Sequence, residues 1–163
     1  MSTLKLKDGT EIFYKDQGQG PTLMFHHGWP LSSDDWDAQV IFFLQRGYRV
    51  VTHASSGHGR SSQNIYNHTI EQYASDVAEL VDFLDLKDVV HIGHSTGGGE
   101  VIRYVNKYAE KNGLIGFTFN SPNLSLAKCQ IPRWEGCVSA NQEMINWHEE
   151  TNIPLFSWSA QAG

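Results

Sequence analysis

The chain has 163 residues, of which 40% are hydrophobic and 12% aromatic, and these proportions are typical of a folded globular protein rather than a disordered one. Its formal net charge is −6 without a basic cluster, which argues against nucleic acid or an anionic membrane as a partner. No apolar run approaches the ~20 residues that a membrane span needs, and the N-terminus lacks a signal-like pattern, so we expect a single cytoplasmic domain over residues 1–163.

Strand-like and helix-like segments alternate along the chain, and their periodicity and turn residues predict the element order. Strands are expected at 4–7, 11–16, 22–26, 48–52, 89–93 and 114–120, and helices at about 33–46, 69–86 and 98–111. This alternation predicts an α/β fold with a mainly parallel, doubly wound sheet, in which ligands bind at the carboxyl ends of the strands.

Local signals mark the ends of several elements. Asp8-Gly9 predicts a hairpin turn between the first two strands. Ser32 or Ser33 can cap the first helix, and Thr69 with Gln72 forms the capping-box pattern of the second. The side chains that we expect to be buried between sheet and helices are Trp36, Phe43, Tyr73, Val77, Leu80, Val90 and Ile92.

The most informative stretch is Gly93-His94-Ser95-Thr96-Gly97, which follows a short apolar strand and precedes a helix-compatible segment. Gly-x-Ser-x-Gly in that context is the pattern of a nucleophile elbow, in which the serine Oγ is exposed on a sharp turn. Two glycines suit such a turn because little room remains beside the serine. The following helix would direct free N–H groups at developing negative charge. A Gly/Ser-rich turn without chemistry is the alternative, because the motif is short.

Three motifs carry a resemblance that extends over about residues 4–106. They are His26-His27-Gly28-Trp29-Pro30-Leu31, Gly57-His58-Gly59-Arg60-Ser61-Ser62 and Gly93-His94-Ser95-Thr96-Gly97-Gly98-Gly99-Glu100. In this order and spacing they resemble the α/β-hydrolase family, closely its cofactor-free bacterial haloperoxidase, arylesterase and perhydrolase branch. The resemblance implies Ser95 as nucleophile and an oxyanion hole from the backbone N–H groups of Trp29 and Thr96. It also implies a small acyl or ester substrate, attack on the acyl-enzyme by water or hydrogen peroxide, and neither metal nor other cofactor.

Two features depart from that family. It usually has Asp-x-Arg before the Gly-x-Gly-x-Ser loop, where this chain has Ala54 and Ser56. A serine nucleophile also needs a base and an orienting acid, which in this fold follow the serine. After Ser95 the sequence has no aspartate and a single histidine, His148, in a predicted helix where a solvated side chain is the simpler interpretation. We therefore expect little or no activity.

The remaining histidines and acids have less specific interpretations. The acids after Ser95 that could orient a base are Glu100, Glu110, Glu135, Glu143, Glu149 and Glu150. The histidines before it are expected to serve loop hydrogen bonding and packing, and they are His26, His27, His53, His58, His68, His91 and His94. A metal site built from His26, His27, His58 and His94 is a weak alternative, since no carboxylate motif accompanies them.

The segment from about 107 to 163 is similar to a different family. Three stretches of this segment resemble a fragment of an aldo-keto reductase. They are Tyr108-Ala109-Glu110-Lys111-Asn112-Gly113-Leu114, Ser121-Pro122-Asn123-Leu124-Ser125-Leu126-Ala127 and Pro154-Leu155-Phe156-Ser157-Trp158-Ser159-Ala160-Gln161-Ala162-Gly163. None of that family's catalytic residues has a counterpart here. We expect a truncated hydrolase-like core at 1–106 joined to a fused or divergent βαβ-like segment at 107–163, with a helix at 139–150 and an exposed edge strand at 153–159 that favours self-association.

Three functional hypotheses follow from these observations. The first is a serine hydrolase of the esterase or perhydrolase type with an incomplete triad. The second is a non-catalytic fusion product or small-molecule-binding pseudoenzyme. The third, and weakest, is a fragment of an NADP-dependent oxidoreductase, because an isolated slice without a Gly-rich or basic phosphate cradle should not bind the cofactor tightly.

Overall fold

The computed structural model describes residues 2–108 together with 142, 146, 149 and 150. The chain divides into two compact units, Met1–Leu114 and Ile115–Gly163. In the first unit the elements are β1 (Ser2–Lys5), β2 (Glu11–Gln17), β3 (Thr22–His26), the 3-10 turn η1 (Ser33–Trp36), α1 (Asp37–Leu44), β4 (Arg49–His53), α2 (Ile70–Phe83), β5 (Val90–Gly93) and α3 (Thr96–Tyr108). They follow the predicted order, and the fold is of the α/β class.

The five described strands form one sheet in the order β1-β2-β4-β3-β5. The pairing is mixed: β4, β3 and β5 run parallel, whereas β2 is antiparallel to both β1 and β4. The parallel part is thus confined to the three strands that precede the candidate site. Gly9, with φ of +92°, lies in the predicted hairpin turn between β1 and β2.

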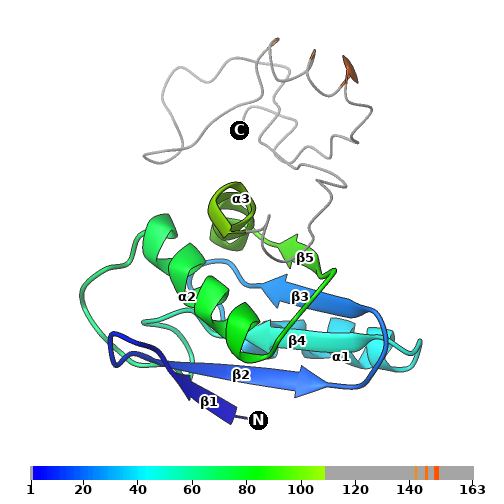
Figure 1. The fold of residues 1–163 in the computed structure, drawn as a ribbon, viewed down its shortest axis with the longest axis horizontal. Coiled ribbons are helices and arrows are strands. Elements are labelled where there is room, and N and C mark those ends of the chain that lie inside the picture. The colour runs from blue at the N-terminus through cyan, green and yellow to red at the C-terminus, as the bar shows by residue number, and fades with distance from the viewer. Residues whose placement is uncertain (1, 109–141, 143–145, 147–148, 151–163) are drawn as a thin grey trace, which may run out of the picture. The chain divides into compact units, whose positions relative to one another are not determined.

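Helices cover both faces of the sheet, as the doubly wound prediction requires (Figure 1). On one face, α2 and α3 pack over an apolar cluster that includes Met24, Val51 and Leu80. On the other face, α1 packs over Phe25 and Val50. Each helix therefore buries one apolar stripe against the strands, which is the main source of stability in such a fold.

The helix starts follow from their capping residues. Ser32 makes a reciprocal capping box with Asp35, and η1 and α1 together fill the predicted first helix. Thr69 accepts a hydrogen bond from the Gln72 N–H, as predicted. The Gln72 side chain does not complete the box, because its amide donates to Asp76 Oδ1 at 2.8 Å instead.

The predicted core is correct for some side chains and wrong for one. Val77 and Leu80 are 2% and 1% exposed. Trp36, Phe43, Tyr73 and Ile92 are half-buried. Val90 is 49% exposed, because β5 is the last strand on its side of the described sheet. The strand that was expected to cover it, at 114–120, lies outside the described residues.

In the second unit, the described residues belong to the helix predicted at 139–150. Residues 142, 146, 149 and 150 are helical, and Gln142 donates to Asn146 Oδ1 at 2.8 Å, one turn away. His148 and the expected strand at 153–159 lie outside the described part of the chain.

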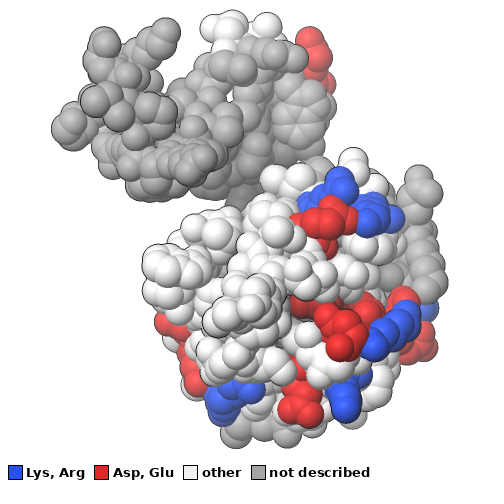
Figure 2. Space-filling model, turned by 90° about the vertical axis from the view of Figure 1, so that its left-hand side faces the viewer, with Lys and Arg blue, Asp and Glu red and all other residues white. Residues whose placement is uncertain are grey.

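Acidic and basic side chains are interspersed on the face of the molecule drawn in Figure 2. Glu71 pairs with Arg103 and Lys107, and Asp16 pairs with Arg49. Within residues 2–108, none of the helices combines the length and the apolar character that crossing a bilayer demands.

Candidate active site

Ser95 stands between the end of β5 and the first residue of α3, on a turn with an unusual backbone. Its φ of 55° lies in the left-handed region, which costs a non-glycine residue ~1–2 kcal/mol. The turn is held by hydrogen bonds from the His94 N–H to the His26 carbonyl at 3.0 Å and from the Gly97 N–H to the His94 carbonyl at 2.9 Å. The Ser95 side chain is exposed. Strand, strained serine and helix follow one another as the motif predicts.

Glycines surround this serine because backbone segments approach too closely for a side chain. A Cβ on Gly97 would lie 2.3 Å from the His26 carbonyl oxygen, and one on Gly93 would lie 2.5 Å from the Gly97 carbonyl oxygen. A Cβ on Gly28 would lie 2.9 Å from the Ser95 Cβ. The prediction that Gly93 and Gly97 make room for the turn is confirmed, and Gly28 serves the same purpose from the loop after β3.

The loop after β3 brings the two candidate oxyanion-hole residues together. The Trp29 N–H donates to Thr96 Oγ1 at 2.9 Å, across 67 positions of sequence. Thr96 is the first residue of α3, so its own N–H has no partner within the helix. Trp29 is 72% exposed. The structure therefore gathers Trp29, Ser95 and Thr96, with the Thr96 hydroxyl accepting from one of the two candidate donors.

Directly below the elbow lies a buried polar cluster that the sequence analysis missed. Glu100 Oε1 lies 2.5 Å from His26 Nδ1 and 3.0 Å from His53 Nε2, and these two nitrogens are 3.2 Å apart. His26 Nε2 lies 2.9 Å from His91 Nδ1, and the Ser55 hydroxyl donates to Glu100 Oε2 at 3.2 Å. His26, His53 and Glu100 are at most 2% exposed.

Burial determines the protonation of this cluster. Removal from water lowers the pKa of both His26 and His53 to about 3, so both imidazoles are neutral at pH 7. The same desolvation raises the pKa of Glu100 to about 7, although the neighbouring histidines and the Ser55 hydroxyl oppose the rise. The interior below the elbow thus carries a carboxyl group whose ion-pair partners in the described chain are histidines that burial keeps neutral.

His27 links the loop after β3, which contains Trp29, to the residues that follow β4 through two hydrogen bonds. Its Nδ1–H donates to the Gly28 carbonyl at 2.9 Å, and its Nε2 accepts from the Ser55 N–H at 2.9 Å. These two bonds fix one neutral tautomer, and burial lowers the pKa of His27 in agreement with it. His27 therefore positions the loop, as the sequence analysis expected of the histidines that precede Ser95.

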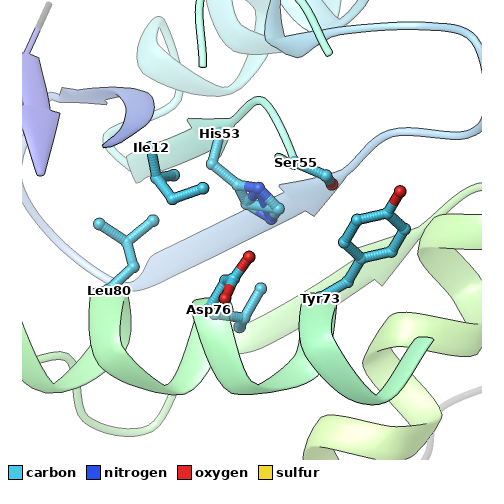
Figure 3. Close-up of a pocket in the computed structure, with 7 residues that line it drawn as sticks. Ile12, His53, Ser55, Tyr73, Asp76 and Leu80 are labelled. Carbon is cyan, nitrogen blue, oxygen red and sulfur yellow. The ribbon is translucent and has the colours of Figure 1, made fainter. Parts of the chain in front are cut away.

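A small hollow lies beside this cluster between β4 and α2, where His53, Ser55, Tyr73 and Asp76 point toward the same space (Figure 3). Asp76 is buried, and its Oδ2, like Ser56 Oγ, lacks a hydrogen-bond partner of good geometry among the described residues. Desolvation raises the pKa of Asp76 to about 6. Ser56 is one of the two positions where the sequence departs from Asp-x-Arg.

The structure identifies no general base for Ser95 among residues 2–108, because no hydrogen bond there joins the Ser95 hydroxyl to a histidine. Glu100 is engaged with His26, His53 and Ser55. Glu149 and Glu150 are exposed in the second unit, and the other candidate acids together with His148 lie outside the described residues.

Comparison with known proteins identifies the family. Residues 21–157 match the model of the alpha/beta hydrolase fold, so the chain belongs to that family. The match covers much of the segment after residue 106, and the likeness of that segment to an aldo-keto reductase gains no support from it.

Individual relatives narrow the likeness further. Over 108 residues the chain is 60% identical to a non-heme haloperoxidase of Rhodococcus erythropolis, a match that covers 66% of this chain and 39% of that protein. It is 56% identical over 110 residues to the bifunctional esterase/perhydrolase DCH of Acinetobacter calcoaceticus, covering 66% and 40%. Among solved structures, bromoperoxidase from Bacillus anthracis superposes with a TM-score of 0.67 at 30% identity, covering 91% of this chain and 53% of that one. The chain spans well under two thirds of the length of these relatives.

Proposed function

We propose that the chain is a serine hydrolase of the esterase or perhydrolase type that acts on small acyl or ester compounds, with Ser95 as nucleophile. The observation that carries the proposal is the strained turn at Ser95, with a φ of 55° and an exposed side chain, beside the Trp29 N–H. Such strain persists where a structure needs a side chain held in one direction. The names of the haloperoxidase and esterase/perhydrolase relatives support the same chemistry.

In the proposed reaction, Ser95 Oγ attacks the acyl carbon, and the carbonyl oxygen becomes an oxyanion. The N–H groups of Trp29 and Thr96 would donate to this oxyanion, and one such donor typically contributes ~3–4 kcal/mol to transition-state stabilisation. The leaving alcohol departs, and water or hydrogen peroxide attacks the acyl-enzyme to give an acid or a peracid. After Ser95 the sequence offers His148 as its single histidine, and we expect it to be a solvated helix side chain, so we expect this polypeptide to turn over slowly.

Hydrolysis of p-nitrophenyl acetate tests this proposal. We expect a rate within about two orders of magnitude of background, because residual catalysis by the oxyanion hole and binding survives without a triad. Ser95→Ala should lower the excess over buffer, because only the share that depends on the nucleophile is lost, and Ser2→Ala, which removes an exposed hydroxyl from β1, serves as the control. A rate near ~10 per second that depends on Ser95 would contradict the incomplete triad.

The second hypothesis is a non-catalytic protein that binds small acyl compounds. The bond from the Trp29 N–H to Thr96 Oγ1 favours it, because the candidate hole already holds an acceptor. A fluorophosphonate probe separates the two hypotheses. Labelling that is lost in Ser95→Ala indicates a nucleophilic serine, whereas equal signals from both proteins support the non-catalytic hypothesis.

Two proposals concern the rest of the chain. A reductase-like origin of residues 107–163 predicts at most weak NADPH binding, which a fluorescence titration measures.

Self-association through an uncovered sheet edge predicts an apparent mass that rises with concentration in sedimentation. Val90, half-exposed on the last described strand, supports an uncovered edge. We also propose a cytoplasmic location.

A further inference from the structure

We propose that His26, His53 and Glu100 form a buried site for one divalent transition-metal ion, best suited to Zn²⁺. The three side chains come from β3, the end of β4 and the first turns of α3, and each offers one ligand atom. The ligand atoms all lie within 4.8 Å of one another. The site is separate from Ser95 and extends the sequence expectation, in which Glu100 and His53 had no part in a metal site.

The spacing of these atoms is close to that around zinc. Zinc bonds of ~2.0–2.2 Å in tetrahedral geometry put neighbouring ligand atoms ~3.3 Å apart. His53 Nε2 lies 3.2 Å from His26 Nδ1 and 3.0 Å from Glu100 Oε1, which matches within a few tenths of an ångström. The remaining pair, His26 Nδ1 and Glu100 Oε1, is 2.5 Å apart and must open by less than ~1 Å.

The chemistry of the three groups also suits a cation. The two imidazole nitrogens lie within 3.2 Å of each other and of Glu100 Oε1, and imidazole binds metals through such a nitrogen lone pair. Glu100 is 1% exposed and contributes a carboxylate whose charge a divalent ion neutralises.

The surrounding residues hold the ligands as the outer contacts of metal sites do. A histidine that binds metal through one nitrogen usually hydrogen-bonds through the other. His26 Nε2 faces His91 Nδ1 at 2.9 Å, so His26 can bind the ion through Nδ1 while its Nε2–H donates to His91. The second oxygen of Glu100 accepts from the Ser55 hydroxyl at 3.2 Å. Both partners lie outside the three ligands and need no rearrangement.

The ligand set selects the class of ion. Two imidazoles and one carboxylate suit Zn²⁺, Co²⁺, Ni²⁺ and Cu²⁺, whereas Ca²⁺ and Mg²⁺ prefer oxygen ligands alone. Because the ligands are buried, an ion would enter while the chain folds. With three protein ligands, a water molecule would take the fourth tetrahedral position. Such an ion would join β3, β4 and α3 beneath the elbow.

The test refolds the full chain after chelation, with and without one equivalent of Co²⁺ or Zn²⁺. A background variant with Cys129→Ser and Cys137→Ser removes the thiols as competing ligands. We expect one bound ion per chain, the visible bands of tetrahedral Co²⁺, and a melting temperature several degrees higher with Zn²⁺. In the same background, His53→Asn and Glu100→Gln should each weaken Zn²⁺ binding at least tenfold, while His68→Asn, at a more exposed histidine, should not.

Three results would overturn the proposal. One is that the refolded chain holds no metal in the presence of excess Zn²⁺. Another is that His53→Asn and Glu100→Gln leave binding unchanged. The third is an X-ray absorption spectrum that shows oxygen-only coordination. The spectra are recorded on the Cys129→Ser and Cys137→Ser background without further substitutions, so they decide the matter even where His53→Asn or Glu100→Gln fails to refold.

Discussion

Two neighbouring pairs of side chains on one face of the sheet are equally buried but chemically opposite. Met24 and Val51 face each other across β3 and β4, are fully buried, and belong to the apolar core. The same parallel register brings His26 level with His53, two residues further along both strands, and they are 0% and 2% exposed. Two residues further along both strands, the apolar contact is thus replaced by a cluster of imidazoles and a carboxyl group.

The two parts of this face gain stability in different ways. The apolar part gains free energy in proportion to the area that it removes from water. The polar part loses the hydration of its groups and recovers it only through hydrogen bonds and suitable protonation. Substitutions in the first part should therefore act at every pH, whereas those next to the second should depend on pH.

The largest expected effect is in the apolar part. Leu80→Ala should lower the free energy of unfolding by ~2–5 kcal/mol, because Leu80 is 1% exposed and its removal leaves a cavity between α2 and the sheet. Denaturant unfolding measures this loss. Phe83→Ala, on the same helix but 58% exposed, is the control and should cost less than ~1 kcal/mol. Equal losses would mean that α2 does not pack through Leu80.

The next effect is expected at the elbow, where Gly97 contacts the backbone of His26 at the boundary between the apolar and the polar part of the sheet face. Gly97→Ala should cost ~1–3 kcal/mol, since its Cβ would lie 2.3 Å from a backbone oxygen that cannot turn aside. Gly98→Ala meets only ordinary contact at 3.8 Å and lies inside α3, so it should gain ~0.5–1 kcal/mol from helix propensity. Thermal melts of the pair give the comparison. A neutral Gly97→Ala would show that the elbow has room to relax.

The last effect distinguishes the polar part by its pH dependence. Asp76 has its pKa raised by burial from 3.8 to about 6. Protonation therefore favours the folded state, and stability falls as pH rises from about 4 to 6. Asp76→Asn should leave stability unchanged near pH 3 and raise it by ~3 kcal/mol above pH 6, since about two pKa units at ~1.4 kcal/mol each separate the folded value from the ordinary one. Denaturant midpoints from pH 3 to 8 measure this difference, with Asp82→Asn, at an exposed position of the same helix, as the control. A difference that does not vary with pH would contradict the shifted pKa.

The sequence predicted the elements whose signals are local. Gly93, Ser95 and Gly97 define the elbow by their spacing alone, and Thr69 and Ser32 mark helix starts through hydrogen bonds two or three residues away. The apolar stripe of α2 repeats at helical spacing, so Val77 and Leu80 were assigned correctly to the core.

The buried cluster could not be predicted in the same way. His53 lies 27 positions and Glu100 74 positions after His26 in the sequence. Only the register of β3 against β4 and the start of α3 bring the three residues together. A partial signal was present, because His26 and His53 both end parallel strands. The prediction that Val90 is buried was wrong for a related reason, since the burial of a strand depends on its neighbours in the sheet and not on its own apolar character.

The bond between the Trp29 N–H and the Thr96 hydroxyl has a thermodynamic consequence for ligands. Any carbonyl compound that uses this N–H must take the place of an acceptor that already sits 2.9 Å away. Binding then exchanges one hydrogen bond for another, so this contact adds little net enthalpy. Calorimetry of acyl ligands should therefore give a more favourable enthalpy for Thr96→Val than for the parent chain, because the competitor is gone while the two side chains remain similar in shape.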